Sequence, residues 1–304
     1  MKVAIVQKAP VHFDLDGTLE KAIDAIEEAS GQGAQLVVFG ETWFCGYPAW
    51  LDYAPEVAFW DHKPVKKLFA KMLDNSLDLE SKALKKLRDV AKEKTVGLVV
   101  GANEVGKLAK GSIFNTIFVI DEKGQLVNHH RKLVPTYTEK MLYAHGDGQG
   151  LKSSTIFGTK VSASVCWEHW MPLTRQALHD SGEEIHVALW PKVHEMHQIA
   201  SRQYAFEGRC FVLAAGQMLK ASDLPEELKF GERISSEEWI LNGGSCVIRP
   251  SGKYLVPPQF DEEKLIYAEI DLNEVKEESM TLDVSGHYQR HDIFGLEINR
   301  SRKK

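Results

Sequence analysis

Three polar side chains in this sequence each lie at the end of a predicted strand. Glu41 comes after four apolar residues and a glycine, Lys132 comes after the basic stretch "NHHR", and Cys166 ends the stretch "KVSASVC". Side chains at the carboxyl ends of strands in an open α/β sheet converge on the ligand crevice. A carboxylate can take the proton of a thiol, and an ammonium can stabilise negative charge that develops on the attacked atom. The three residues therefore predict a nucleophilic site around Cys166.

Each of these residues also has an ordinary structural interpretation. Glu and Lys residues at strand ends are mostly solvated, and a free cysteine often packs as a small hydrophobic residue. We interpret Cys45, Cys210 and Cys246 as packing residues of this kind. Glu168 is either a site residue or a carboxylate favoured at the start of a helix.

A metal centre is the alternative that the histidines raise. His129, His130 and His169 do not combine with cysteines at the spacing of a structural zinc site. A thiolate nucleophile needs no metal, and we expect neither a metal nor a cofactor.

Apolar runs and amphipathic segments alternate along the chain, which predicts an α/β fold with mixed sheets. The longest irregular stretch is expected between Thr42 and Asp78, where aromatic residues argue against disorder. Strands are expected at 2–7, 34–41, 95–104, 160–168, 185–191 and 210–216, hairpin turns at 122–124 and 250–252, and helices at 18–30 (with Thr18 as N-cap), 79–94, 174–180 and 198–207.

The composition excludes some classes of partner and indicates the cellular compartment. The chain has 304 residues, a formal net charge of −6 and four cysteines. A nucleic-acid or anionic-membrane binder would be basic, so neither partner is expected. Four cysteines in a chain of this length make no disulfide framework, which favours a reducing compartment. We expect a cytoplasmic protein with one domain over residues 1–304 and a short C-terminal tail from about residue 287.

Several ordered segments together carry a family resemblance. "FGETWFCGYP", "HRKLVPTYTEKMLYAHGDG" and "SVCWEHWMPL" resemble the nitrilase superfamily, and specifically its nitrile-hydrolysing branch. "EGRCFVLAAGQ" and "GGSCVIRPSGKYL" are similar to family segments in the expected order, so the resemblance runs from Lys2 to about Phe294. It implies an αββα sandwich of mixed sheets with flanking helices.

The resemblance also assigns roles to residues. Cys166 matches the nucleophile, Glu41 the general base, Lys132 the catalytic lysine and Glu139 a second glutamate that orients the lysine. We expect the thiol pKa to fall beside Lys132, with Glu41 acting in the opposite sense, and we expect burial to raise the Glu41 pKa. The candidate substrate-binding residues are Tyr47, Trp167, Glu168, His169 and Trp170.

The implied activity is hydrolysis of an organic nitrile to a carboxylic acid and ammonia, through a cysteine thioimidate and thioester. An amidase or carbamoylase of the same superfamily is the alternative, because it would use the same triad. A catalytically silent binding or assembly module is the other, although all three triad residues are present. We expect a homodimer or higher homo-oligomer, formed in part by the segment Met171–Asp180. The spiral assembly of relatives with long C-terminal extensions is in doubt for this shorter chain.

Overall fold

Two β-sheets organise the protein, as seen in a computed structural model that describes residues 1–44, 46–106, 111–224 and 234–302. The first sheet has the strand order β13-β1-β2-β3-β4-β5, with β1, β2 and β3 parallel and the other neighbours antiparallel. Its strands are β1 (Lys2–Gln7), β2 (Leu36–Phe39), β3 (Gly97–Val105), β4 (Ile113–Ile120), β5 (Leu126–Arg131) and β13 (Lys264–Glu269).

The second sheet has the order β10-β11-β9-β8-β7-β6, and β12 pairs with β11. Strands β7, β8 and β9 are parallel, so their carboxyl ends lie at one edge. The strands are β6 (Ser154–Ile156), β7 (Thr159–Val165), β8 (Ile185–Leu189), β9 (Phe211–Ala215), β10 (Met218–Lys220), β11 (Trp239–Ile248) and β12 (Tyr254–Phe260).

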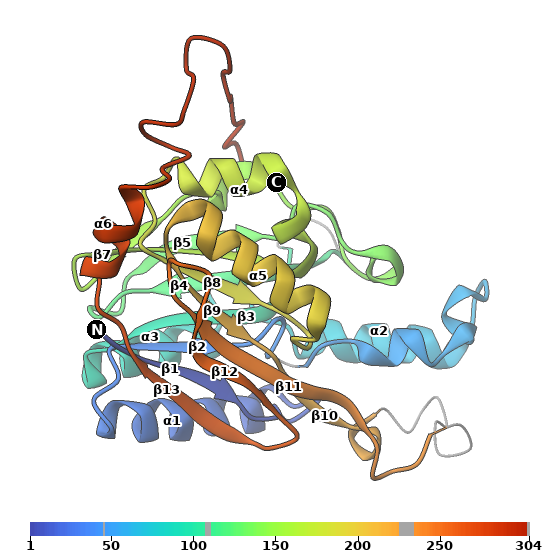
Figure 1. Cartoon of the computed structure of the whole chain (residues 1–304). Helices are drawn as coiled ribbons and strands as arrows, with labels where there is room; N and C mark the ends of the chain where they lie inside the picture. The colour runs from blue at the N-terminus through green and yellow to red at the C-terminus, as the bar shows by residue number, and fades with distance from the viewer. Residues whose placement is uncertain (45, 107–110, 225–233, 303–304) are drawn as a thin grey trace.

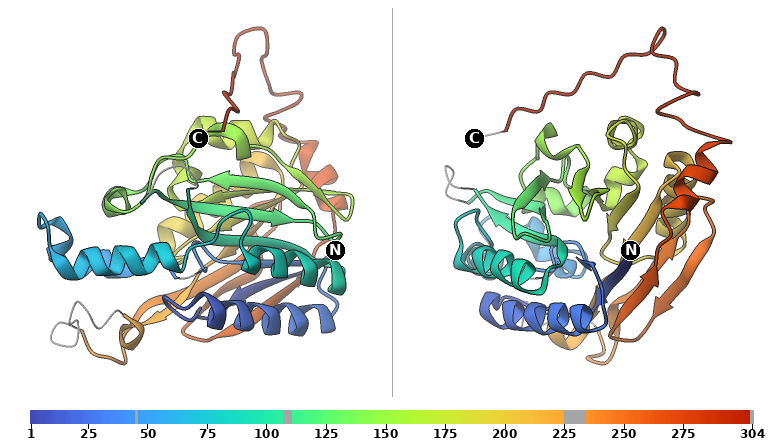
Figure 2. Two further views of the ribbon diagram at one scale, coloured as in Figure 1. Left: turned by 180° about the vertical axis from the view of Figure 1, so that it is seen from behind. Right: turned by 90° about the vertical axis from the view of Figure 1, so that its left-hand side faces the viewer.

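Helices cover the outer faces of both sheets (Figures 1 and 2). Helices α1 (Leu15–Gly31) and α3 (Lys82–Lys94) lie on the first sheet, and α5 (Glu195–Gly208) lies on the second, next to α4 (Pro172–His179). The remaining helices are α2 (Lys63–Asp74) and α6 (Asn273–Ser279), with short 3-10 turns at Ala49–Asp52, Pro55–Ala58, Tyr137–Met141, Gly148–Gly150, Cys166–Trp170 and Ala221–Asp223.

Strand alternation divides the core into two layers. In β1, Val3 and Ile5 pack between the two sheets, whereas Ala4 and Val6 pack under α1 and α3. This follows from the period of two along a strand, which sends successive side chains to opposite faces. Both faces of β1 are therefore buried, which is why its sequence is almost continuously apolar. The arrangement confirms the predicted αββα sandwich.

Two helix starts differ from the sequence prediction. Helix α1 is capped by Asp14, whose side chain accepts a hydrogen bond from the Gly17 N–H at 2.9 Å. Thr18 is not the N-cap, because its hydroxyl donates to the Val11 carbonyl instead. Helix α3 begins at Lys82 rather than Leu79, because the Ser81 side chain caps it.

The prediction that residues 42–78 are irregular was wrong over one stretch. Helix α2 occupies Lys63–Asp74, with Pro64 in its first turn and with Leu68 and Met72 buried at helical spacing. The aromatic residues that precede this helix obscured its periodicity.

The C-terminal segment projects from the body and then returns to it (Figure 1). After α6, residues 280–302 form neither helix nor strand. Arg302 closes the loop by donating to the His129 carbonyl at 2.6 Å and pairing with Asp147 at 3.2 Å. None of the helices in the described ranges combines the length and apolar character that crossing a bilayer requires.

Candidate active site

The ends of β2, β5 and β7 bring the three predicted residues to the space between the sheets. Glu41 follows β2 after Gly40, and Lys132 directly follows β5 in the same sheet. Cys166 directly follows β7 of the second sheet. Strand β7 pairs with the edge strand β6, so it is not a central strand of that sheet. All three side chains are buried.

Lys132 is held between two carboxylates. Its Nζ donates to Glu41 Oε1 at 2.9 Å and to Glu139 at 2.7 and 3.0 Å. Burial alone would lower the Lys132 pKa, but the nearby negative charges more than offset it and raise the pKa above its ordinary value. The ammonium is therefore permanently charged at neutral pH.

Glu41 has the environment of a tunable base. Burial raises the pKa of its carboxyl from 4.5 to about 7, although Lys132 and Asn115 act in the opposite direction. Asn115 Nδ2 donates to Oε1 at 2.7 Å, whereas Oε2 is buried without a hydrogen-bond partner. A carboxyl that titrates near pH 7 and keeps one oxygen free is suited to proton transfer. The expectation that burial raises this pKa is confirmed.

Cys166 sits in a left-handed backbone conformation, with φ of 46°, as the first residue of the 3-10 turn Cys166–Trp170. Burial and the Glu41 charge raise the pKa of its thiol well above the usual value, while Lys132 and the Trp167 backbone N–H lower it. The expected fall in the thiol pKa was therefore wrong, because desolvation outweighs the single ammonium. The resting cysteine is a thiol that must lose its proton during reaction.

Glu139 is anchored from several sides. It accepts from the Tyr47 hydroxyl at 2.9 Å and from the Thr136 backbone N–H at 2.8 Å, besides both contacts with Lys132. The Glu139 backbone N–H in turn donates to the Thr136 carbonyl at 2.8 Å, at the start of the 3-10 turn Tyr137–Met141. The local turn thus fixes the carboxylate that holds the lysine, and Tyr47 approaches the same cluster.

Glu168 connects the two strand ends. It accepts from the Leu133 N–H at 2.9 Å, the Val165 N–H at 2.8 Å and His130 Nε2 at 2.9 Å. These donors lower its pKa, although burial acts against them. Because Leu133 follows Lys132 and Val165 precedes Cys166, this carboxylate ties together the backbone on which both side chains stand.

The other candidate substrate-binding residues occupy different surroundings. His169 is buried and bonded to the Cys166 carbonyl, whereas the Trp167 side chain is 49% exposed. The Trp167 and Trp170 rings lie 4.7 Å apart, and Trp170 also contacts Trp190. Glu168 and His169 both make hydrogen bonds within the protein. Their proposed contact with substrate stays a prediction.

Three of the aromatic residues that precede α2 pack in the interior, whereas Phe59 and Trp60 are exposed. Trp43 and Phe44 join Phe39 in the core beneath the first sheet, and Trp50 is buried in a separate cluster. Of this group, Tyr47 reaches the carboxylates.

Sequence reasoning missed two side chains that fix Glu41. Asn115, in β4, bonds its carboxylate, and Gln217 Nε2 donates to its backbone carbonyl. Asn115 had a detectable signal, because an amide inside the apolar stretch "IFNTIF" needs a buried partner. Gln217 lies 176 positions from Glu41, and only the packing of the two sheets joins them.

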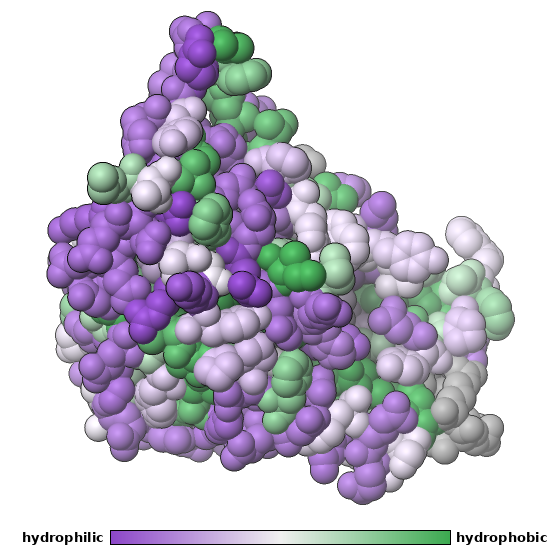
Figure 3. Space-filling model, viewed as in Figure 1, coloured by the Kyte–Doolittle hydropathy of each residue, from purple (hydrophilic) through white to green (hydrophobic). Residues whose placement is uncertain are grey.

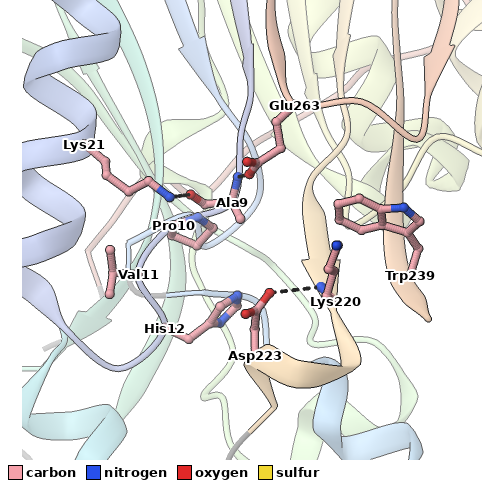
Figure 4. A pocket seen from close by; sticks show the side chains of 9 residues that line it. All are labelled: Ala9, Pro10, Val11, His12, Lys21, Lys220, Asp223, Trp239 and Glu263. Atoms are coloured by element: carbon pink, nitrogen blue, oxygen red, sulfur yellow. Dashed lines mark hydrogen bonds between the residues drawn. The ribbon is translucent and has the colours of Figure 1, made fainter. Parts of the chain in front are cut away.

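A separate cavity of about 440 Å³ lies outside this cluster (Figure 4). It opens between the loop after β1 and the strands β10 and β11, and none of Glu41, Lys132, Glu139 and Cys166 lines it. Its residues are Ala9, Pro10, Val11, His12, Lys21, Lys220, Asp223, Trp239 and Glu263. Within the described ranges, no group of three or more His, Cys, Asp or Glu residues could hold a metal ion. Cys45 lies outside the described residues, whereas Cys210 and Cys246 are buried and free.

The arrangement can perform covalent catalysis at an electrophilic carbon. A thiol, a carboxyl that titrates near neutral pH and a fixed ammonium share one desolvated space, where electrostatic interactions are strong. The carboxylate can accept the thiol proton, and the ammonium can stabilise charge on the atom attached to the attacked carbon.

Comparison with known proteins gives consistent results. Residues 2–278 match the family model for carbon-nitrogen hydrolases. The chain is 35% identical to Nitrilase 2 of an unknown prokaryotic organism, over 99% of this chain and 93% of that protein. It is 34% identical to an aliphatic nitrilase of Rhodococcus rhodochrous, over 98% and 82% of the two chains.

An arylacetonitrilase of Fusarium vanettenii is 32% identical over the whole chain and 94% of its own length. Among solved structures, a carbon-nitrogen hydrolase from Helicobacter pylori matches 97% of this chain and 96% of its own, with a TM-score of 0.69 and 20% identity. An amidase from Nesterenkonia matches 91% and 92%, with a TM-score of 0.66 and 20% identity.

Proposed function

The chain belongs to the carbon–nitrogen hydrolase family and to its nitrilase branch, and from this premise we propose that it hydrolyses an organic nitrile to the carboxylic acid and ammonia. The reaction proceeds through a covalent adduct of Cys166. The observation that carries the proposal is the buried Glu41–Lys132–Glu139 cluster, whose charges all act on the Cys166 thiol.

In the first step the thiol adds across the carbon–nitrogen triple bond. Glu41 takes the thiol proton as sulfur bonds to the nitrile carbon, and that proton passes to the nitrogen, which gives a neutral thioimidate. Lys132 lies against Glu41 and stabilises negative charge that develops on the nitrogen. The high thiol pKa makes this coupled proton transfer necessary, since little free thiolate exists at neutral pH.

Water completes the reaction in two additions. The first water loses a proton to Glu41 and adds to the thioimidate carbon, and the tetrahedral intermediate expels ammonia to leave a thioester. A second water hydrolyses the thioester, releases the acid and restores the thiol. Glu139 keeps Lys132 in place throughout, because both of its oxygens bond the ammonium.

Aromatic side chains supply the apolar wall that a nitrile substituent needs. The Tyr47 hydroxyl contacts Glu139, and the exposed Trp167 directly follows the nucleophile. We assign these two residues to the substrate side of the site. The test therefore includes both aliphatic and aromatic nitriles.

The direct test is a panel of aliphatic, aromatic and arylaliphatic nitriles with their matching amides. Ammonia, acid and amide are measured for each compound. We expect ammonia and acid in equal amounts from at least one nitrile, with less activity on its amide. Turnover of amides with none of the nitriles would identify an amidase, and inertness toward both would favour a silent module.

A matched pair of cysteine variants tests the nucleophile. Cys166→Ala is expected to abolish ammonia release and adduct formation while the circular dichroism spectrum is unchanged. Cys210→Ala, at another buried free cysteine, is expected to keep activity within a few fold. Ammonia release by Cys166→Ala at the parent rate would remove the proposed nucleophile.

A further inference from the structure

A chain of buried polar side chains lies behind the nucleophile, on the helix-covered face of the second sheet. His169 Nδ1 lies 2.7 Å from the Cys166 carbonyl oxygen, and its Nε2 lies 3.0 Å from both Ser164 Oγ and His186 Nε2. His186 Nδ1 in turn lies 3.1 Å from Glu183 Oε2. All of these side chains are buried, and none of them faces Glu41 or Lys132 through a described hydrogen bond.

Packing and hydrogen bonds restrict the whole chain. The His169 ring stacks on Trp190 at 4.6 Å, and the His186 ring stacks on Tyr204 at 3.8 Å. The second oxygen of Glu183 accepts from the Tyr204 hydroxyl and from His179 Nδ1, both at 2.7 Å. Elements β7, β8, α4 and α5 thus all contribute to the position of one imidazole.

The proton positions on His169 follow from its partners. A carbonyl oxygen can only accept, so His169 carries its proton on Nδ1 and donates it to Cys166. Burial lowers the pKa of His169 to about 3, so the ring is neutral and its Nε2 accepts. The Glu183 carboxylate also only accepts, so the neutral His186 ring carries its proton on Nδ1 and its Nε2 accepts as well. The donor at His169 Nε2 is therefore the Ser164 hydroxyl, which lies 3.0 Å from that atom and 3.1 Å from His186 Nε2. Fixing the tautomer of one imidazole by the partner on its other nitrogen is a recurring device in enzyme sites.

The contact with Cys166 has a direct consequence for the thiol. The Cys166 carbonyl and the Trp167 N–H belong to the same planar peptide unit and point in opposite directions. The Trp167 N–H interacts with the Cys166 sulfur and favours its charged form. Holding the carbonyl therefore also fixes the direction of the N–H, at a residue whose left-handed backbone carries a conformational cost.

We propose that His169 is a positioning residue, which holds the Cys166–Trp167 peptide so that its N–H faces the nucleophilic sulfur. Ser164 holds His169 in the required tautomer, and His186, fixed by Glu183, packs against the ring and keeps it in place. This inference rests on the proposed role of Cys166 as nucleophile. It assigns His169 to the support of the nucleophile rather than to contact with substrate.

Two isosteric variants separate the hydrogen bond from general packing. His169→Asn places an amide N–H near the position of Nδ1, whereas His169→Gln places it near Nε2. We expect His169→Gln to lower kcat about 100-fold with little change in KM, because small misplacements of a reacting group have effects of this size. His169→Asn should keep kcat within about tenfold of the parent. Equal losses in the two variants would overturn the proposal.

A second measurement does not depend on turnover. The rate of Cys166 alkylation by iodoacetamide is followed against pH by peptide mass spectrometry. We expect the profile of His169→Gln to move up by about one pH unit, because the Trp167 N–H no longer favours the thiolate, and that of His169→Asn to stay near the parent's. An unchanged profile in His169→Gln would reject the proposal.

The control is His197→Asn, because His197 also packs on Trp190, at 4.7 Å, but makes no described contact with Cys166. It should leave both measurements unchanged. Ser164→Ala removes the donor at His169 Nε2 and is expected to shift the alkylation profile in the same direction as His169→Gln. If the parent hydrolyses no nitrile or amide while the alkylation shifts appear, the proposed function fails and the positioning role stands.

Discussion

Glu41 is the residue whose chemistry the structure constrains most directly. Its pKa of about 7 comes mainly from burial, and its Oε2 is buried without a hydrogen-bond partner. The carboxylate form is the one that accepts the thiol proton. We therefore expect kcat/KM for a nitrile to rise with pH through an apparent pKa of about 7, measured as an initial-rate profile. A rate independent of pH between 5 and 9 would contradict this assignment.

Removing the Asn115 side chain is expected to shift the pH at which kcat/KM rises. Asn115 donates to Glu41 at 2.7 Å and lowers the carboxyl pKa, so removing it in Asn115→Ala should raise the pKa. We expect the acid limb of kcat/KM to shift up by about one pH unit, which corresponds to about 1.4 kcal/mol. The matched control is Asn128→Ala, in the neighbouring strand, whose amide bonds the Gly150 carbonyl instead. A shift of the same size in both variants would show that Asn115 acts through general stability.

Replacing Glu41 and Glu139 by glutamine, one at a time, should have different effects on the reaction. Glu41→Gln removes the base and is expected to slow adduct formation and adduct hydrolysis by about 10²–10⁴-fold. Glu139→Gln keeps Lys132 beside Glu41 and should slow the reaction less, or release more amide. Mass spectrometry after mixing with a nitrile reports both adduct steps. Normal turnover by Glu41→Gln would exclude it as the base.

At the scale of elements, Glu168 joins the end of β5 to the end of β7. Its carboxylate accepts two backbone N–H groups and His130, so Glu168→Gln would set an amide NH₂ against these donors. We expect a loss of about 3 kcal/mol in the free energy of unfolding, together with a lower kcat. Urea denaturation measures the first. The control is Glu27→Gln at the exposed pair with Lys94, which should cost less than about 1 kcal/mol.

The pH dependence of this contribution has a definite sign. The folded-state pKa of Glu168 lies below its ordinary value, so its stabilisation is present above the unfolded carboxyl pKa and is lost as pH falls through the folded value. The difference in stability between the parent and Glu168→Gln should therefore narrow in acid. A gap that widened below pH 4 would contradict the role of the ionised carboxylate.

The positions of some elements could be predicted from the sequence alone, whereas the contacts between elements could not. The ends of β2 and β7 were predictable because each is an apolar run followed by a polar residue, and the end of β5 because a hairpin turn precedes that strand. The three side chains that follow these ends do lie together. The chain from Glu183 to His169 was not predictable, since it depends on the register that pairs Ser162 with His186. The N-cap of α1 was predicted at Thr18 but lies at Asp14, because the Thr18 hydroxyl bonds the Val11 carbonyl, a contact that the sequence pattern does not show.

At the scale of the whole molecule, the helical layer over the second sheet exposes several large apolar side chains. Leu173 on α4 and Met196, Ile199 and Phe206 on α5 are large apolar side chains with 44–69% of their surface exposed. Figure 3 shows apolar side chains over α5 on an otherwise largely hydrophilic face. Exposed apolar groups of this kind mark interaction sites on soluble proteins.

We therefore expect a homo-oligomer that buries this layer against a second copy. Sedimentation velocity at micromolar concentration should show a species of at least twice the 34.2 kDa chain mass. Ile199→Glu places a charge in the proposed interface and should shift the population toward monomer, because an unpaired buried charge is costly. Leu79→Glu, at an exposed residue before α3 on the opposite layer, should leave the oligomer intact. A single species near the chain mass in the parent, or equal dissociation by both variants, would reject α4 and α5 as the interface.

Helices α4 and α5 also carry His179 and Tyr204, which bond Glu183. An oligomer through this face would therefore contact the helices that help to position the side chains behind Cys166. The Ile199→Glu monomer should then retain the fold by circular dichroism and lose part of its kcat.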